Sequence, residues 1–140
     1  MNDKLTVAIE RLRSLNEPVP RPLRLPTPEE VEKAENLLGI KFPVDYRRFL
    51  LEAGDVIFGP KEPATLTRPE SHTHLIKVCD AAWNSYGVSK ELLPICEDNA
   101  DFYCVKADGE VVYWSHNGWS GERWADLATW IDECWIGESM

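Results

Sequence analysis

Two histidines and a cysteine come closest to a metal-binding pattern in this sequence. His72 and His74 are separated by one residue, and Cys79 follows them. Structural zinc sites usually take four ligands, often as closely spaced pairs, and a fourth ligand is missing here. The segment also opens an expected helix, on which residues i and i+2 do not share a face. We therefore expect a solvated helix start and no metal site.

A second group of chemically capable side chains lies in the sequence Glu97-Asp-Asn-Ala-Asp101. An EF-hand calcium loop needs a glycine at its sixth position and a bidentate glutamate at its twelfth, where this sequence has Phe102 and Asp108. Paired carboxylates could also act as acid and base in glycoside hydrolysis. Carboxylates in a turn between two strands are more often hydrated. We therefore predict an exposed acidic turn rather than a calcium or catalytic site.

The four cysteines give no indication of catalysis. None belongs to a CxxC pair, and each has apolar neighbours, so we expect buried free thiols at Cys79, Cys96, Cys104 and Cys134. The sequence contains no Gly-x-Ser-x-Gly elbow, no Walker loop and no Gly-x-Gly-x-x-Gly fingerprint. We therefore predict no catalytic residue and no cofactor, and the pattern favours a binding protein over an enzyme.

The net charge limits the classes of partner. The 140-residue chain has 15 basic and 24 acidic side chains, a net charge of −9, and residues 51–140 alone carry −10. Such a surface repels nucleic-acid phosphates and anionic lipid headgroups, so we expect neither nucleic acid nor a membrane as partner. It attracts a basic protein, although acidity also serves solubility alone. Without a secretion signal or a membrane-spanning run, a cytoplasmic location is expected.

The chain divides into an N-terminal extension and one domain. Apolar residues at helical spacing predict a helix over residues 4–15, and five prolines in residues 18–28 predict an extended connector. Thr27 and Glu30 then form a capping box that starts a helix. We assign an N-terminal helix and proline-rich connector to residues 1–26, and the domain to residues 27–140.

The domain mixes helices with short strands. Helical patterns occupy residues 28–38, 43–53, 71–86 and 122–136. Strand patterns occupy residues 56–58, 92–96, 102–106 and 111–115. Asp108-Gly109 is a strong hairpin turn between the last two strands. This order predicts an α+β fold with a central antiparallel sheet flanked by helices, and a mixed sheet is the alternative.

Tryptophan is concentrated toward the end of the chain, where five of the six occur after residue 113. Helical spacing predicts that Trp124 and Trp135 lie in the core. Trp119 lies in a glycine-flanked turn, and Trp130 falls off the main apolar stripe. These two are therefore the better candidates for exposed anchors in a protein interface, where tryptophan is enriched.

Four segments of the sequence form a recognisable series: the helix Thr27–Gly39 with Ile40-Lys-Phe-Pro43, the helix Phe42–Gly54, the strand pair Leu93–Val105, and Val112–His116 with the closing helix. In this order they resemble the SUKH superfamily, which contains bacterial immunity proteins and fungal cell-wall assembly regulators. Together they cover about residues 27–136, most of the chain, and in the third of them Asp98, Asn99 and Ala100 replace the glycines usual in the family.

The resemblance implies a SUKH-like domain that works by binding. Bacterial members commonly bind and block a toxin domain, often a nuclease, and a nuclease carries basic residues for its substrate. An acidic surface over residues 51–140 is suited to such a partner. We therefore expect a non-enzymatic immunity protein whose partner is a cognate toxin domain. The expected partner-binding residues are Asp98, Asn99, Asp101, Asp108, Glu110, Trp119 and Glu122.

Two other functions stay open at this point. The chain could be an intracellular scaffold or regulatory binding protein unrelated to toxins, as the fungal relatives are. A small ligand-binding or enzymatic domain with a cleft beside the sheet is the less favoured third reading. A toxin gene beside the gene for this chain would favour the immunity function over the scaffold function. A small molecule that raises the melting temperature would support the ligand-binding or enzymatic domain.

Overall fold

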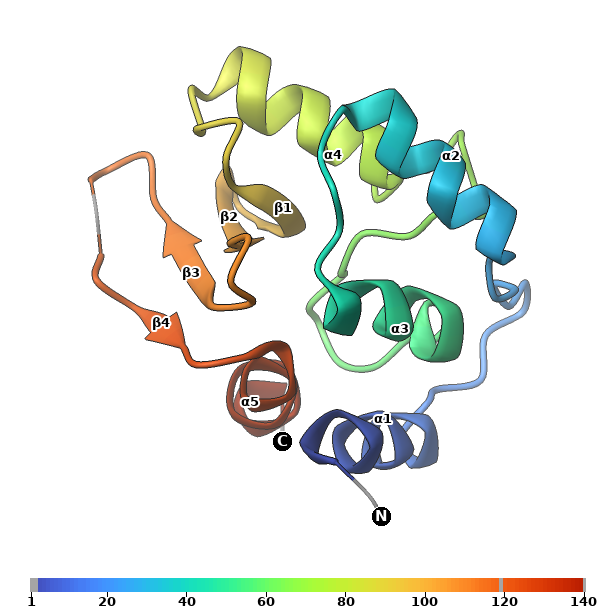
Figure 1. The fold of residues 1–140 in the computed structure, drawn as a ribbon. Helices are drawn as coiled ribbons and strands as arrows, with labels where there is room; N and C mark the ends of the chain where they lie inside the picture. Colours follow the sequence, from blue (N-terminus) through green and yellow to red (C-terminus); the bar gives the residue numbers. More distant parts are fainter. Residues whose placement is uncertain (1–2, 119, 140) are drawn as a thin grey trace.

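The computed structural model describes residues 3–118 and 120–139. Helices α1 to α5 lie around a small sheet, with α1 and α5 side by side at the bottom of the view (Figure 1). The helices are α1 (Lys4–Ser14), α2 (Pro28–Leu38), α3 (Val44–Ala53), α4 (Leu75–Asp80), α5 (Leu127–Trp130) and the short α6 (Gly137–Ser139). Two π-helical turns extend this set, η1 (Ala81–Ser85) after α4 and η2 (Ile131–Ile136) between α5 and α6.

The sheet is antiparallel throughout and follows the chain order β1-β2-β3-β4. Its strands are β1 (Leu93–Asp98), β2 (Asp101–Val105), β3 (Val111–Trp114) and β4 (Arg123–Trp124). The predicted α+β fold with an antiparallel sheet is confirmed. The predicted hairpin turn is also present between β2 and β3, where Gly109 adopts a φ of +95° that other residues rarely tolerate.

Helix α1 is part of the same hydrophobic core as the helices of residues 27–140. It packs against α3, α5 and η2, and its apolar face, including Ala8 and Leu12, is fully buried. Lys4 bonds Asp126 at 3.2 Å, and Arg13 bonds Asp55 at 2.7 Å, so ion pairs border this packing on both sides. The predicted division at residue 26 therefore separates two segments that share one core.

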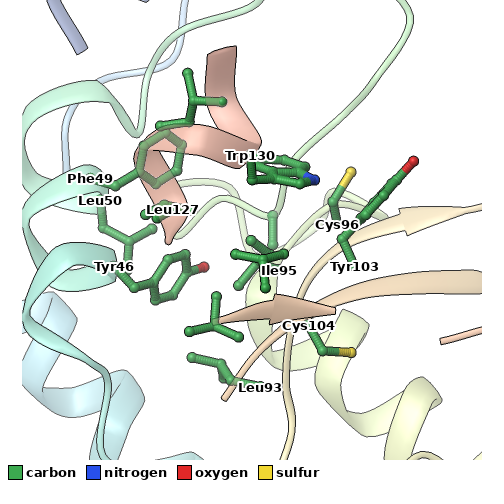
Figure 2. Close-up of a cluster of buried hydrophobic side chains, with 14 of the residues drawn as sticks. Tyr46, Phe49, Leu50, Leu93, Ile95, Cys96, Tyr103, Cys104, Leu127 and Trp130 are labelled. Carbon is green, nitrogen blue, oxygen red and sulfur yellow. The ribbon is translucent and has the colours of Figure 1, made fainter. Parts of the chain in front are cut away.

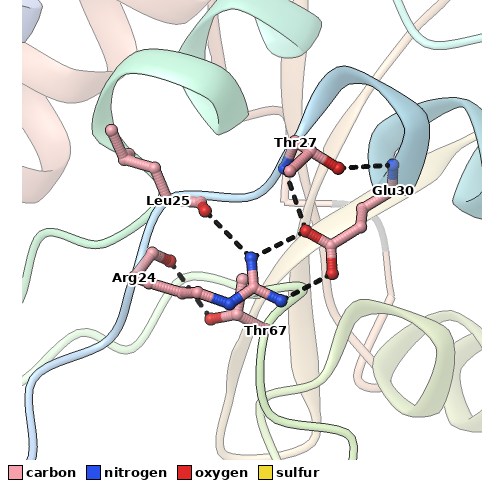
Figure 3. Close-up of polar contacts among 5 residues, drawn as sticks. All are labelled: Arg24, Leu25, Thr27, Glu30 and Thr67. Carbon is pink, nitrogen blue, oxygen red and sulfur yellow. Dashed lines mark hydrogen bonds and ion pairs between the residues drawn. The ribbon is translucent and has the colours of Figure 1, made fainter.

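The proline-rich connector is extended and is tied to the domain at its C-terminal end (Figure 3). Arg24 makes a two-pronged ion pair with Glu30, with both N···O distances 2.7 Å, and its carbonyl accepts a hydrogen bond from Thr67 at 3.2 Å. Glu30 also accepts from the backbone N–H of Thr27, whose hydroxyl accepts from the N–H of Glu30. The predicted capping box is confirmed, and the same carboxylate anchors the connector.

The main core forms between α3, the sheet and α5 (Figure 2). Tyr46 and Phe49 of α3 and Ile95 of β1 are buried there, and Trp130 of α5 lies beside Tyr103 with ring centroids 5.4 Å apart. All four cysteines are buried and unpaired, as predicted.

Three predicted elements differ from the structure. The helix expected from residue 71 begins at Leu75, with His74 as its N-cap. Residues 56–58 form no strand, because their backbone bonds the two residues that precede the proline-rich connector: the N–H of Ile57 donates to Asn16 at 2.8 Å, and the carbonyl of Ile57 accepts from Glu17 at 2.8 Å. The last helix begins at Leu127 rather than residue 122, because Asp126 caps it by accepting from the N–H of Thr129 at 2.8 Å.

The later helix start changes the positions of the tryptophans. Trp124 lies on β4, half-buried, with its ring 5.7 Å from Tyr103. Trp130 is fully buried, so the prediction that it is an exposed anchor is wrong. The π-helical η2 has wider turns than an α-helix, which shifts the apolar stripe and buries both Trp130 and Trp135. Trp119 lies outside the described residues.

Candidate functional site

The acidic turn, defined here as residues 97–101, joins β1 to β2. Asp98 and Asp101 are the last paired residues, and the two residues between them both have positive φ, 50° at Asn99 and 72° at Ala100. This geometry is that of a two-residue type I′ turn. Asparagine tolerates the left-handed conformation, whereas alanine is strained in it. The turn therefore has a defined shape without the glycines that the family pattern leads one to expect.

A hydrogen-bond network fixes the two aspartates of the acidic turn. The hydroxyl of Tyr113 lies 3.0 Å from Asp98 Oδ2 and 3.1 Å from Asp101 Oδ2, so one hydroxyl proton serves both carboxylates. Asp101 Oδ1 also accepts from the backbone N–H of His116 at 3.0 Å and lies 2.6 Å from His116 Nδ1. The network joins the acidic turn to β3 and to the start of the β3–β4 loop.

The network also sets the protonation of two of its members. Burial raises the pKa of Asp101, but the hydrogen bonds from His116 and Tyr113 outweigh burial and hold the pKa below its usual value. Burial and the two neighbouring carboxylates raise the pKa of Tyr113. At neutral pH Asp101 is therefore ionised, and Tyr113 keeps the proton that it donates.

The acidic turn retains its negative charge. Among the described residues, no lysine or arginine lies within ion-pair distance of Glu97, Asp98 or Asp101. Glu97 and Asn99 are exposed, and Asp98 is partly so. A hollow of about 340 Å³ adjoins the turn, lined by side chains that include Glu62, His72, Glu97 and Asp98.

One lysine, Lys61, also lines this hollow, but its charge is already matched. Only 14% of its side chain is exposed, and its ammonium bonds the carboxylate of Glu138 at 3.1 Å. Burial lowers the pKa of Lys61, but Glu138, together with the nearby acidic groups of Cys134 and Asp98, outweighs burial, so the pKa is raised. The hollow is therefore lined by three carboxylates, those of Glu62, Glu97 and Asp98, and by a lysine that is already paired.

The hairpin tip, defined as residues 106–110, lies at the other end of β2. Four residues of β2, 102–105, at about 3.3 Å each separate it from the acidic turn. Its two predicted site residues are partly neutralised: Glu110 bonds Lys106 at 3.1 Å, and Asp108 lies 3.9 Å from the same lysine. Arg123 of β4 lies 3.8 Å from Glu110. The structure therefore divides the predicted binding set between two ends of the sheet.

Glu122 is exposed on the β3–β4 loop, which leaves the sheet at the same end as the acidic turn. Its backbone is fixed, because its N–H donates to Ser120 at 3.2 Å and its carbonyl accepts from the N–H of Tyr113 at 3.1 Å. Asp98, Asn99 and Asp101 thus form one group, with Glu122 on the adjoining loop, and Asp108 and Glu110 form another.

Sequence reasoning missed Tyr113 and His116 as parts of the site. For Tyr113 the Asp108-Gly109 pair gives the wrong register, because a two-residue turn there pairs Tyr103 with Trp114, whereas the structure pairs Tyr103 with Tyr113. For His116 no local pattern distinguishes it from a solvated loop histidine.

The side chains offer little for metal binding or nucleophilic chemistry. Within residues 3–118 and 120–139, no three His, Cys, Asp or Glu side chains are grouped so that they could hold a metal ion. Burial raises the pKa of Cys134 to about 11 and that of Cys96 to about 12, so these thiols are protonated at neutral pH. No helix in the described part of the chain is long and apolar enough to cross a membrane.

Fold and site together define a small α+β protein that presents a fixed acidic turn. A family model described as SMI1-KNR4 cell-wall, of the SUKH type, matches residues 5–136, and the chain belongs to this family. The match begins at residue 5 and so includes α1, which the motifs read from the sequence did not cover. Proteins of the SUKH family are generally non-enzymatic.

One solved structure is closely similar. A crystal structure of a protein from Pseudomonas syringae pv. tomato is 44% identical to this chain and superposes with a TM-score of 0.89. The alignment covers 94% of this chain and 98% of that one. A comparison with curated proteins gave no match.

Proposed function

We propose that this chain is an immunity protein that binds and neutralises a cognate bacterial toxin domain in the cytoplasm of the cell that makes it. The observation that carries the proposal is the acidic turn, in which Tyr113 and His116 hold the carboxylates of Asp98 and Asp101 in place and no lysine or arginine of the described residues lies within ion-pair distance of them. A toxin that acts on nucleic acid carries a basic surface. Opposite potentials speed the encounter of two such proteins and exclude wrong partners.

The fixed geometry of the turn favours binding as well. A side chain that is already ordered loses less conformational entropy when a partner binds. Tyr113 and His116 order Asp98 and Asp101 before any partner arrives. We therefore propose that the primary contact surface consists of the acidic turn, the adjoining hollow and Glu122, with Asp108 and Glu110 outside this surface.

The proposal is tested by co-expression with the toxin domain encoded beside this gene. Wild-type protein is expected to restore growth, and the double variant Asp98→Asn/Asp101→Asn to lose at least tenfold in affinity for the toxin, chiefly through slower association at low salt. The matched control is Glu10→Gln/Glu133→Gln, which removes the same charge from two exposed positions outside the turn and keeps wild-type affinity.

Two results would contradict the proposal. If the toxin kills equally with and without this protein, the immunity function fails for that pair. If the toxin binds but the Asp98/Asp101 variant and the control lose affinity equally, net charge rather than this turn is responsible.

A further inference from the structure

A second surface lies at the opposite end of the sheet from the acidic turn, where the hairpin tip meets the α2–α3 loop. It contains a hollow of about 200 Å³ that we call the lysine hollow. The residues that line it include three lysines and one glutamate around apolar groups, so its ionic lining is positive in a chain of net charge −9. They are Ile40, Lys41, Pro43, Lys90, Glu91, Leu93, Val105, Lys106 and Ala107.

Two of these lysines are available to a partner. Lys41 and Lys90 are exposed, and neither forms an ion pair with any residue that the structure describes. Lys106 is engaged with Glu110 at 3.1 Å. The free positive charge is therefore concentrated at Lys41 and Lys90.

An apolar area adjoins the lysine hollow. A neighbouring hollow of about 440 Å³ shares Lys41, Pro43 and Ala107 with it and is also lined by Val44. Val44 has 71% of its surface exposed, the largest fraction among the large hydrophobic residues of the described chain. Two carboxylates, Asp45 and Asp108, also line this second hollow, so it suits an uncharged group and not a second acidic one. A ligand that spans both hollows therefore places its acidic group at the lysine hollow and an apolar group against Val44.

We propose that this corner binds a peptide segment of a partner protein in which a carboxylate stands beside a large apolar side chain. The carboxylate lies between Lys41 and Lys90, and the apolar side chain covers Val44. Charge complementarity selects the occupant, because the unpaired lysines attract an acidic group and repel a basic one. Burial of an aliphatic or aromatic side chain supplies the non-polar centre that protein interfaces have. This surface is separate from the acidic turn and does not depend on its function.

The experiment is an NMR titration of the full chain with a synthetic probe. The probe is an acetylated, amidated hexapeptide with two glutamates followed by leucine and phenylalanine, between terminal serines. Backbone amide shifts are expected around residues 40–44, 90–93 and 105–107, with few at residues 97–101. Two control peptides, one with lysine in place of glutamate and one with serine in place of leucine and phenylalanine, are expected to bind at least fivefold more weakly.

Charge reversal at the two lysines tests the assignment. The variant Lys41→Glu/Lys90→Glu is expected to weaken probe binding at least tenfold. The control Lys33→Glu/Lys77→Glu makes the same charge change at exposed positions outside the lysine hollow and is expected to stay within twofold of wild type. All four positions are exposed, and circular dichroism confirms folding of each variant.

Three results would overturn the proposal. The first is the absence of shifts at this corner, or shifts located elsewhere. The second is equal weakening by the two double variants. The third is concentration-dependent self-association that Lys41→Glu/Lys90→Glu abolishes, because a second copy of this chain would then be the occupant.

Discussion

Replacing Ala100 by glycine should stabilise this protein, although most substitutions destabilise. Ala100 has a φ of +72°, in the left-handed region, where an L-residue is less stable by about 1–2 kcal/mol. Glycine removes this strain but loses about 0.4–1 kcal/mol through the greater freedom of the unfolded chain. The net gain is about 0.5–1 kcal/mol. The variant also creates an Asn-Gly pair, which type I′ turns prefer.

Urea denaturation followed by tryptophan fluorescence measures the gain. The midpoint should rise without a change in slope, since the variant alters neither the native core nor the surface exposed on unfolding. For 140 residues the unfolding entropy is about 0.3 kcal/mol/K, so the melting temperature should rise by about 2–3 °C.

Ala107→Gly is the matched control. Ala107 also lies in a hairpin turn, but it has no positive φ, so glycine there should destabilise by about 0.4–1 kcal/mol. If Ala100→Gly lowers stability as much as Ala107→Gly does, the left-handed alanine carries no strain, and the account of the acidic turn as a fixed, strained type I′ hairpin is refuted.

Three further predictions concern the core and the connector. Gly59→Ala should destabilise by about 1–3 kcal/mol in urea titrations, because φ is +65° and the new Cβ would lie 2.7 Å from Ser139. Leu12→Ala should cost about 2–5 kcal/mol, because the side chain is fully buried. Glu30 has a pKa lowered to about 2, chiefly by Arg24, so its contribution to stability is present above its ordinary pKa of 4.5 and is lost as pH falls toward 2. Arg24→Ala should therefore flatten the decline in stability over this pH range.

Each of these has a control. Gly87→Ala meets no neighbouring atom at a φ of +80°, so it should cost less than Gly59→Ala, and an equal cost would exclude the clash. Val7→Ala on the exposed side of α1 should change stability by less than about 0.5 kcal/mol, and a similar loss for Leu12→Ala would mean that α1 is not docked. For Arg24→Ala, a pH profile that matches wild type between pH 4.5 and 2 would show that the Arg24–Glu30 pair is not populated in solution.

Local signals in the sequence predicted those parts of the fold that depend on neighbours in the chain. The capping box of Thr27 and Glu30 and the Asp108-Gly109 turn are short-range hydrogen-bonding and backbone effects, and both are present. The helix over residues 122–136 was only partly correct, because Asp126 competes as a cap and the π-helical η2 changes the period on which the apolar stripe was counted.

Features that depend on contacts between distant segments could not be predicted from these local signals. Segment 56–58 has a strand composition, but its hydrogen-bond partners, Asn16 and Glu17, lie about 40 residues earlier, just before the connector. The acidic residues of the predicted site were grouped by charge, whereas antiparallel pairing places Asp98 and Asp108 at opposite ends of β2. Tyr113, which orders the acidic turn, is recognisable only after the strand register is known.

The packing of α1 on α5 and η2 has a consequence for biosynthesis. The apolar face of α1 finds part of its covering only in residues 127–136, near the other end of the sequence. During translation this helix therefore emerges from the ribosome long before its partner, and Leu5, Ile9 and Leu12 remain open to chaperones or to neighbouring nascent chains. Docking of the first helix on the last is expected to complete folding only after synthesis has passed residue 136.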